Sequence, residues 1–192
     1  MRLTAIALIA GGLAAPLRAQ TCGSHCGTER WPVKTLTDAD RAHVNFTPAT
    51  ATVAQLLNLP APAQRPANAR VAPTEETTFQ VHGVLIGWKL ERDRDLHLVI
   101  ADPSAPTQTM IVEVPSTTCD HVCSSEHVAE FRAARAALIM KFGTPTSSFH
   151  PFSTPQPITI TGVGFFDFLH GQVGVAANGI ELHPVLAINF EQ

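Results

Sequence analysis

Residues 78–114 read TFQVHGVLIGWKLERDRDLHLVIADPSAPTQTMIVEV, and this stretch decides the predicted fold. Its first part, residues 78–91, is rich in apolar and β-branched residues, which favours one long strand. The apolar alternation changes phase at Gly83, which predicts a β-bulge or a sharp bend at that glycine. Five consecutive charged residues, 91–95, then predict a solvated turn, and two further strands are expected at 96–101 and 109–114.

The two shorter strands predict their own pairing. If Ala101 opposes Thr109 at the end of a hairpin, the numbers of opposed residues sum to 210 and one face of the hairpin is wholly apolar. A slip of one residue would mix the two faces, so the hydrophobic pattern selects this register. The other face then sets His97 opposite Glu113, about 5 Å apart at their β-carbons, where imidazole and carboxylate can interact. We expect either a surface pair or an acid–base group at the rim of a ligand-binding face.

One helix and two strands are expected after the hairpin. Apolar residues recur at helical spacing over 124–142, and Gly143 is typical of the end of a helix. Residues 158–169 and 180–190 predict the last two strands. The order β-β-β-α-β-β predicts a mostly β (α+β) fold: a five-stranded OB-fold-like barrel with a helix between strands 3 and 4. A generic α+β sandwich with one covering helix is the alternative.

The N-terminus has the pattern of a secretory signal peptide. Arg2 precedes an apolar run that is too short to span a membrane, and small residues end it near Ala19. We therefore expect residues 1–19 to be removed, a periplasmic or secreted protein, and no transmembrane segment after cleavage. Of the 13 basic side chains, two lie in this segment, so the mature chain carries eleven basic and sixteen acidic side chains, a net charge of −5.

Residues 20–73 are predicted to be an N-terminal extension with a short irregular or helical character. One helix is expected to start near Thr37, and a second at Thr52, whose capping-box pattern includes Gln55. The Pro/Ala-rich residues 60–73 are typical of an extended connector. The OB-like domain is then expected to comprise residues 74–192.

Four cysteines fall in two pairs of equal spacing, Cys22 with Cys26 and Cys119 with Cys123. An even number in an exported chain favours disulfides, and four cysteines allow three pairings. Bridges between the two pairs would tie the N-terminal extension to the corner before the helix. A zinc site built from thiolates, or a redox-active thiol pair, stays open as an alternative.

Four phrases of the sequence resemble a group of exported bacterial hypothetical proteins: ERWPVKTLTDAD (29–40), DRDLHLVIADP (93–103), TMIVEVPSTTC (109–119) and ITGVGFFDFLHGQVGVAANGIELHPVLAI (160–188). The resemblance covers most of the mature chain. It implies export and a common OB-fold-like β-barrel, and it brings no known activity or catalytic residue. The cysteines at 22 and 26 are not part of it.

An OB barrel binds its ligand on the face of strands 2 and 3, between the loop joining strands 1 and 2 and the loop joining strands 4 and 5. Here those loops are residues 91–95 and 169–179. Residues 95–114 contain no Phe, Trp or Tyr for base stacking, and the net charge is negative, so nucleic acid is an unlikely partner. An unknown small molecule, glycan or protein is expected instead. The ligand-binding candidates are Arg92, Arg94, Asp95, His97, Glu113, His170, Gln172, Asn178, Glu181 and His183.

Three acid–histidine pairs stand out in the sequence: Asp95 with His97, Glu181 with His183, and Asp167 with His170. Residues i and i+2 of a strand point the same way, so the first two pairs suit a metal or an oriented general base. Alternation predicts that Glu181 and His183 point outward as ordinary polar positions. Strands 2 and 5 begin at opposite rims, so the three pairs are not expected to form one site. No metal, cofactor or catalytic residue is predicted.

The sequence thus favours an exported OB-fold-like binding or interaction module of unknown ligand. Common hydrolase and nucleotide-binding motifs are absent from the sequence, which argues against an enzyme. A metal-assisted hydrolase that uses Asp, His and Glu groups on the barrel rim is the alternative. A periplasmic thiol–disulfide protein is the third hypothesis.

Overall fold

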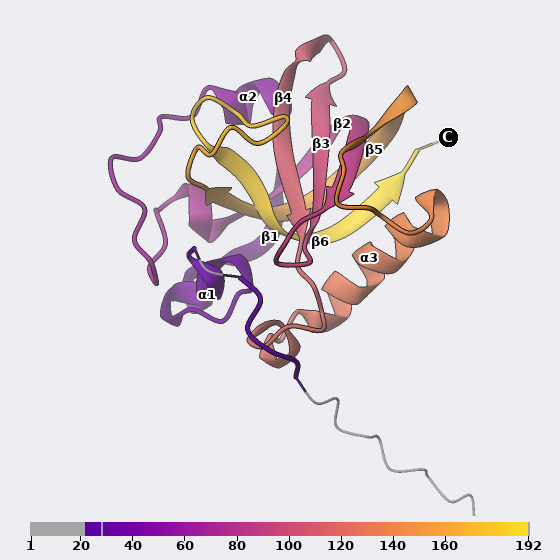
Figure 1. Ribbon diagram of the computed structural model, residues 1–192. Coiled ribbons are helices and arrows are strands. Elements are labelled where there is room, and N and C mark those ends of the chain that lie inside the picture. Colours follow the sequence, from indigo (N-terminus) through magenta and orange to yellow (C-terminus); the bar gives the residue numbers. More distant parts are fainter. Residues whose placement is uncertain (1–21, 28, 192) are drawn as a thin grey trace, which may run out of the picture.

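The computed structural model describes residues 22–27 and 29–191, most of which lie in or around one six-stranded sheet (Figure 1). The predicted signal peptide, residues 1–19, lies outside the described residues. The mostly β, broadly α+β class is confirmed. The elements in chain order are α1 (Trp31–Lys34), the 3-10 helix η1 (Ala39–His43), β1 (Asn45–Thr52), α2 (Val53–Leu57), η2 (Thr74–Glu76), β2 (Thr77–Leu90), β3 (Leu96–Asp102), β4 (Ala105–Val114), η3 (Val122–Ser124), α3 (Val128–Phe142), β5 (His150–Phe166) and β6 (Ile180–Phe190).

Five of the strands close into a ring. The sheet order is β1-β2-β3-β4-β6-β5, and β2 also pairs with β5. β4 and β6 pair in parallel, through Ile111 with Glu181 and Val112 with Leu182, and the other ring pairs are antiparallel. Apolar side chains from these strands form the main core, and α3 packs against β6 and β4. Among the described helices, none is long and apolar enough to cross a membrane.

The predicted hairpin register is confirmed. β3 and β4 pair antiparallel from Leu96 with Val114 to Ala101 with Thr109, and His97 opposes Glu113. The turn is tighter than expected, because β4 begins at Ala105 and a register shift follows Ala101. The hydrophobic pattern therefore predicts the pairing well. The Pro-containing end of the hairpin has no such pattern, so the start of β4 could not be predicted there.

The helices near the predicted caps are also confirmed. Thr52 and Gln55 form a reciprocal capping box at the start of α2, and the Asp38 side chain accepts a hydrogen bond at the start of η1. α3 buries Phe131, Ala134 and Leu138 on its predicted stripe and ends at Gly143, which has a φ of 83°.

A sixth strand, β1, corrects the expected count of five. It runs parallel to the first half of β2, from Asn45 with Thr77 to Thr52 with His82. β1 contains Pro48 and is almost wholly exposed, as an edge strand can be. Its residues therefore lack the apolar alternation by which a strand is recognised in a sequence.

The long first strand of the ring also bends at a different place from the predicted one. The register of β2 with both β3 and β5 shifts between Leu85 and Gly87, not at Gly83. Val81 and Leu85 are buried before the shift and Trp88 after it, whereas Val84 and Ile86 are only partly buried. A side chain on Gly87 would collide with the ring of Phe149, which explains why a glycine stands at the bend.

The last two strands were predicted with different success. β6 has the predicted bounds, whereas β5 begins at His150 rather than at 158 and ends at Phe166. The added part of β5 is rich in proline and mostly exposed, so it carries no apolar pattern. Glu181 and His183, predicted to point outward, are wholly buried.

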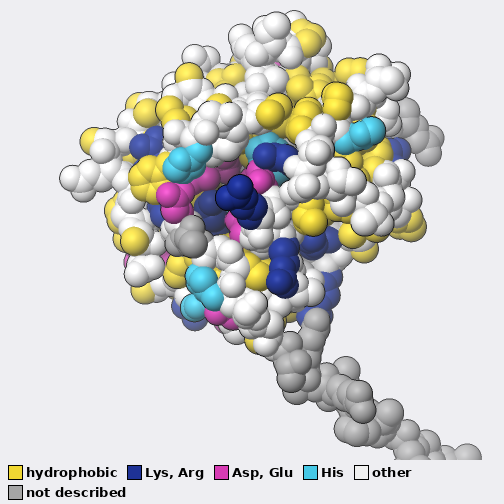
Figure 2. All heavy atoms as spheres, viewed as in Figure 1, with side chains coloured by type: hydrophobic (Ala, Val, Ile, Leu, Met, Phe, Trp, Pro, Cys, Tyr) yellow, Lys and Arg dark blue, Asp and Glu magenta, His cyan; other side chains and the backbone are white. Residues whose placement is uncertain are grey.

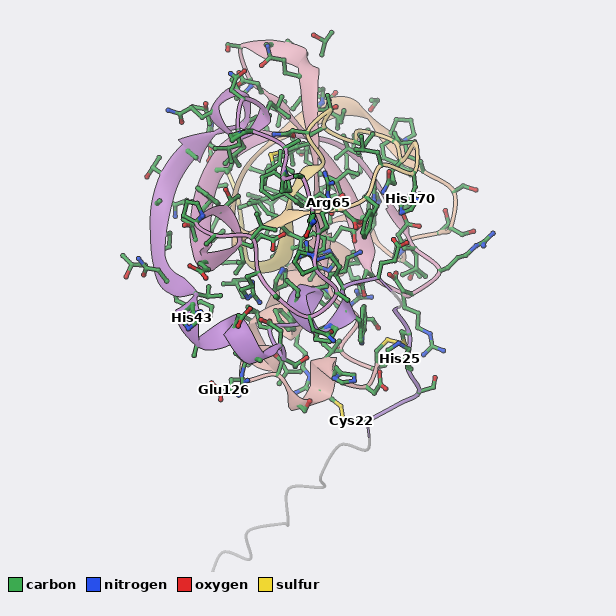
Figure 3. All side chains as sticks on the ribbon, turned by 90° about the vertical axis from the view of Figure 1, so that its left-hand side faces the viewer. Cys22, His25, His43, Arg65, Glu126 and His170 are labelled. Atoms are coloured by element: carbon green, nitrogen blue, oxygen red, sulfur yellow. A yellow bond between two sulfur atoms is a disulfide. The ribbon has the colours of Figure 1, made fainter. Side chains whose placement is uncertain are left out.

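Two disulfides join the N-terminal cysteine pair to the second pair. Cys22 is bonded to Cys123 and Cys26 to Cys119, across sequence separations of 101 and 93 residues. Figure 3 shows Cys22 where the described chain begins, at the edge of the molecule. The predicted link between the N-terminal extension and the corner before α3 is confirmed, and all four sulfurs are used in it.

Buried ion pairs hold the same N-terminal extension from its other side. The Arg30 guanidinium donates to both carboxylate oxygens of Glu75, at 2.6 and 2.7 Å, and to the backbone oxygen of Phe166 at 2.9 Å. Arg70 donates to both oxygens of Asp38. Bidentate pairs of this kind fix orientation as well as distance. They set α1 and its Lys34 against the end of β5.

Removal of the first disulfide, whichever it is, should cost less stability than removal of the one that remains. In chain-entropy terms a first bridge closes a loop near 100 residues, worth about 4.7 kcal/mol, whereas the second closes only a small ring of about ten, worth about 2.7 kcal/mol. Cys22→Ser/Cys123→Ser should therefore lower the free energy of unfolding by about 3 kcal/mol, and replacement of all four cysteines by about 7 kcal/mol. Urea denaturation measures both values. Equal losses for the two variants would contradict this account of the pairing.

Candidate functional site

A pocket of about 510 Å³ opens beside one end of the ring. Four parts of the chain form its walls: the loop between β2 and β3, the end of β4, the segment after β5, and the N-terminal extension. On the corresponding face, acidic side chains gather beside basic and histidine side chains (Figure 2). The residues that line the pocket are Cys26, Gly27, Glu29, Trp31, Lys34, Glu91, Arg92, Asp93, Glu113, Asp167, His170 and Gln172.

Glu113 lines this pocket, and together with the buried His97 behind it forms what we call the floor. Nδ1 of His97 lies 2.9 Å from Oε1 of Glu113 and 3.3 Å from Oε1 of Glu91. Nε2 of the same ring lies 3.0 Å from the backbone oxygen of Val173. A carbonyl oxygen can only accept a hydrogen bond, so Nε2 carries a proton and Nδ1 is left to face the two carboxylates.

His183 lies beneath Glu113, away from the solvent. Its Nδ1 is 3.2 Å from the second oxygen of Glu113 and its Nε2 is 3.4 Å from Oδ2 of Asp95. Neither nitrogen has a hydrogen bond of acceptable geometry among the described residues, although His183 is wholly buried. Oδ2 of Asp95 is also without a partner of that kind, whereas Oδ1 accepts from the backbone nitrogen of Ser116 at 2.7 Å. A buried polar group left without a hydrogen bond costs about 1–3 kcal/mol, so this arrangement is expensive.

The charges of this cluster are set by burial and by one another. Burial lowers the pKa of His183, but Asp95 and Glu113 outweigh it and raise that pKa to about 9. Burial raises the pKa of Glu113, yet His183 and His97 bring it well below its usual range. Burial, together with the carboxylates of Glu113 and Asp167, raises the pKa of Glu181 well above its usual range. The cluster therefore favours the ionised form of Glu113 and the protonated form of Glu181.

Lys34 supplies a buried positive charge at the pocket wall. Its Nζ lies 3.2 Å from Oδ2 of Asp167 and 5.3 Å from the centre of the Phe165 ring. Burial lowers the pKa of Lys34, but Asp167, Glu113 and Glu181 raise it above its usual value. Lys34 therefore stays charged and partly balances the carboxylates around it.

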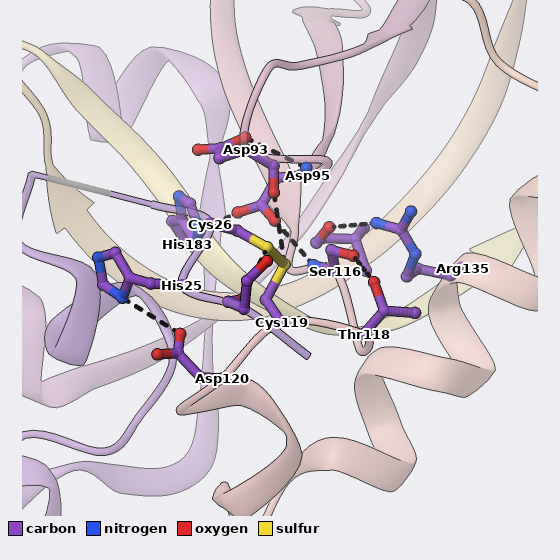
Figure 4. The surroundings of a disulfide bond; sticks show 12 residues. His25, Cys26, Asp93, Asp95, Ser116, Thr118, Cys119, Asp120, Arg135 and His183 are labelled. Atoms are coloured by element: carbon purple, nitrogen blue, oxygen red, sulfur yellow. Dashed lines mark hydrogen bonds and ion pairs between the residues drawn. A yellow bond between two sulfur atoms is a disulfide. The ribbon is translucent and has the colours of Figure 1, made fainter. Parts of the chain in front are cut away.

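One disulfide supports the loop that carries Asp93 and Asp95. The Cys119 sulfur lies 3.6 Å from the backbone oxygen of Asp93, and Oδ1 of Asp93 accepts from the backbone nitrogen of Asp95 at 3.2 Å (Figure 4). Burial and the carboxylates of Asp95 and Glu113 raise the pKa of Asp93 to about 6. The Cys26–Cys119 bridge thus lies against both the pocket and the buried cluster.

The ring brings together groups that were expected to lie apart. Asp95 and His97 on one side, and Glu181 and His183 on the other, meet at Glu113 in a single buried cluster. The expectation of opposite rims was wrong, because the parallel pairing of β4 with β6 places His183 next to the end of β4. Both faces of these strands are covered, so alternation could not separate inward from outward positions.

The third acid–histidine pair, Asp167 and His170, does not join the buried cluster. Asp167 binds Lys34, while His170 pairs with Glu29 at 2.9 Å on the exposed rim. Figure 3 labels both His170 and Arg65, and the Arg65 guanidinium donates to the backbone oxygen of Asn178. Asn178 itself donates its side-chain amide to the backbone of Leu56 and Leu59 and so braces the loop rather than the pocket.

Of the ten sequence candidates, four line the pocket: Arg92, Glu113, His170 and Gln172. Asp95, His97, Glu181 and His183 lie in the buried cluster, and Arg94 is exposed with a φ of 72° in the loop. Sequence reasoning missed Glu29, Lys34, Glu91 and Asp93. Glu91 and Asp93 were interpreted only as solvated residues of the charged turn. For Glu29 and Lys34, the one signal was the cysteine pairing, which predicted that the N-terminal extension lies against the rest of the protein.

Glutamine substitutions should separate the two buried glutamates. Glu113→Gln removes a negative charge that faces two histidines, and the loss of one partner in a buried ion pair costs about 3–5 kcal/mol. Glu181→Gln replaces a protonated acid by an amide of similar shape and should cost less than about 1 kcal/mol. Urea unfolding at pH 7 in the presence of EDTA provides the comparison. Similar losses in the two variants would show that these charge assignments are wrong.

The site is therefore a polar pocket whose floor continues into a buried cluster of carboxylates and imidazoles. Two of its floor groups, His97 and Glu113, were predicted as neighbours from the hairpin register. Comparisons with known protein families, with curated proteins and with solved structures find no match to this chain.

Proposed function

We propose that this chain is an exported, OB-fold-like binding module that holds a small, positively charged ligand in the pocket described above. The observation that carries the proposal is the excess of acidic groups around that pocket. Five carboxylates line it, from Glu29, Glu91, Asp93, Glu113 and Asp167, against only two fixed cations, from Lys34 and Arg92.

The order of elements supports the OB-like part of the proposal. The ring has five strands, its long first strand β2 pairs with both β3 and β5, and α3 lies between the third and fourth ring strands. OB folds bind ligands on the face of their second and third strands, between the loop after strand 1 and the loop before strand 5. Residues from both corresponding loops, Glu91 to Asp93 and His170 to Gln172, line this pocket.

Export is supported by the disulfides and by the N-terminal sequence. Disulfides persist in oxidising compartments and are rare in the cytosol, and the described chain has two. A periplasmic or secreted location is therefore part of the proposal.

The negative charge of the pocket also favours one class of ligand over another. A phosphate-bearing partner such as a nucleic acid would have to approach the five carboxylates and would meet no aromatic platform on β3 or β4. The same negative field attracts a cation. Because the acidic side chains are partly buried, salt screens this attraction less than it would at an exposed site.

Calorimetric titration of the mature chain tests the proposal. Zinc, calcium, putrescine and spermidine are the cationic probes, and inorganic phosphate and a thymidine dodecamer are the anionic ones, at pH 7.5. At least one cation should bind with a Kd below about 100 μM, equivalent to more than about 5 kcal/mol, and neither anion should bind.

Matched variants locate the binding. Asp93→Asn and Glu29→Gln each remove one charge from the pocket wall and should weaken the bound cation about threefold to tenfold. Glu126→Gln removes an exposed charge that does not line this pocket and should leave the Kd unchanged. Binding of the dodecamer, or of no cation at all, would contradict the proposal.

A further inference from the structure

We infer that the floor of the pocket is a divalent metal site, with Nδ1 of His97 and one carboxylate oxygen each of Glu91 and Glu113 as its ligands and zinc as the best-fitting ion. This inference rests on the proposed function and names the cation that the pocket holds. The three ligand atoms all lie within 4.8 Å of one another.

His97, Glu91 and Glu113 together offer three possible metal-ligand atoms. Nε2 donates to the Val173 oxygen, and Nδ1 lies on the side of Glu91 and Glu113, where a metal ion can take the place of its proton. Each of the three atoms lies within 4.8 Å of the other two. A proton on Nδ1 can point along only one of the two directions, whereas a metal ion satisfies all three atoms together.

The distances fit a small tetrahedral ion. The His97 nitrogen lies 2.9 Å from the Glu113 oxygen and 3.3 Å from the Glu91 oxygen. Zinc binds nitrogen and carboxylate oxygen at about 2.0–2.2 Å, so neighbouring tetrahedral ligands lie about 3.3–3.6 Å apart. The separation of His97 from Glu91 falls at the lower end of this range, and the Glu113 oxygen would move outward by about half an ångström.

The surroundings of His97 match those of a metal ligand. A ligating histidine ordinarily donates its second ring nitrogen to a carbonyl or carboxylate, as His97 does to Val173. Gly174 holds that carbonyl in place: it has a φ of 82°, and a side chain there would collide with Val99 on β3. The loop is therefore pressed onto the strand that carries the histidine.

The other oxygen of Glu113 faces a separate, deeper group formed by Asp95 and His183. His183 is wholly buried and faces the other oxygen of Glu113 at 3.2 Å, yet neither of its nitrogens has a hydrogen bond among the described residues. Oδ2 of Asp95 is orphaned beside it. In the inferred site this histidine sets the orientation of the Glu113 carboxylate from below, while Glu113 binds the ion from above.

The inferred site also has an open side. Glu91 and Glu113 line the pocket, whereas His97 is buried behind them. Lys89 donates to the Glu91 oxygen at 2.8 Å and holds that half-buried side chain over the floor. With three protein ligands, the fourth coordination position would face the pocket. It would leave room for water or a small molecule, as in catalytic zinc sites.

Equilibrium dialysis of the EDTA-treated mature chain, with its disulfides intact, tests the inference. The free probe is zinc alone at pH 7.5 in a phosphate-free buffer, and bound metal is measured by mass spectrometry. We expect one zinc ion per chain. Glu91→Gln should weaken zinc binding at least about 100-fold, and Gly174→Ala, through the Val173 carbonyl, about tenfold.

Two controls decide where a bound ion sits. Glu29→Gln changes the rim of the pocket without touching the inferred ligands and should alter zinc affinity less than Glu91→Gln does. His121→Ala removes a member of the exposed group formed by His25, Asp120 and His121, and should have no effect. Loss of zinc in His121→Ala but not in Glu91→Gln would overturn the inference.

Failure of the inference differs from failure of the proposed function. If putrescine or spermidine binds in the pocket and zinc does not, the metal site is wrong and the cation-binding pocket stands. If neither zinc nor an organic cation binds, both are wrong. Circular dichroism of each variant confirms that a loss of zinc is not a loss of fold.

Discussion

The carboxylate of Glu113 is the group around which the polar interior of this protein is arranged. It stands near the end of β4, accepts from His97 on β3 and faces His183 on β6. It also adds to the negative field that keeps Lys34 of α1 charged. A carboxylate this deeply buried is costly unless opposite charges surround it, so the positions of three ring strands and of α1 are coupled through one side chain.

The N-terminal extension belongs to the same arrangement. The two disulfides fix it beside α3, the Arg30 guanidinium fixes it to Glu75 and to the Phe166 backbone, and the Arg70–Asp38 pair closes the extension on itself. Buried apolar side chains, among them Trp31, Leu36 and Val44, anchor the same segment to a second core cluster. The disulfides therefore matter for the pocket as well as for stability, since Cys26 lines it and Cys119 touches the loop of Asp93.

The sequence allowed local features to be predicted well. The register of β3 with β4, the bounds of β6, the capping box at Thr52 and the end of α3 at Gly143 all follow from spacing within a few residues. The predictions that failed concern contacts between residues far apart in the sequence. β1 is a polar edge strand that pairs in parallel with a distant partner, and the bend of β2 lies at Gly87, where it avoids Phe149.

The candidate site shows the same division. His97 opposite Glu113 could be predicted, because both lie in one hairpin. The burial of Glu181 and His183 could not be predicted. An alternating pattern presupposes that one face of the strand is buried and the other is exposed, whereas the ring and the N-terminal extension cover both faces of β6 here. The meeting of the two acid–histidine pairs depends on the parallel contact of β4 with β6, which no local pattern encodes.

Anomalous diffraction at the zinc absorption edge, from crystals of the mature chain grown with zinc, tests the central claim most directly. The account predicts one strong anomalous peak in contact with Glu91, His97 and Glu113, on the pocket side of His97. A peak confined to the exposed His25, Asp120 and His121, a peak beneath Glu113 between Asp95 and His183, or no peak in this cluster would contradict it.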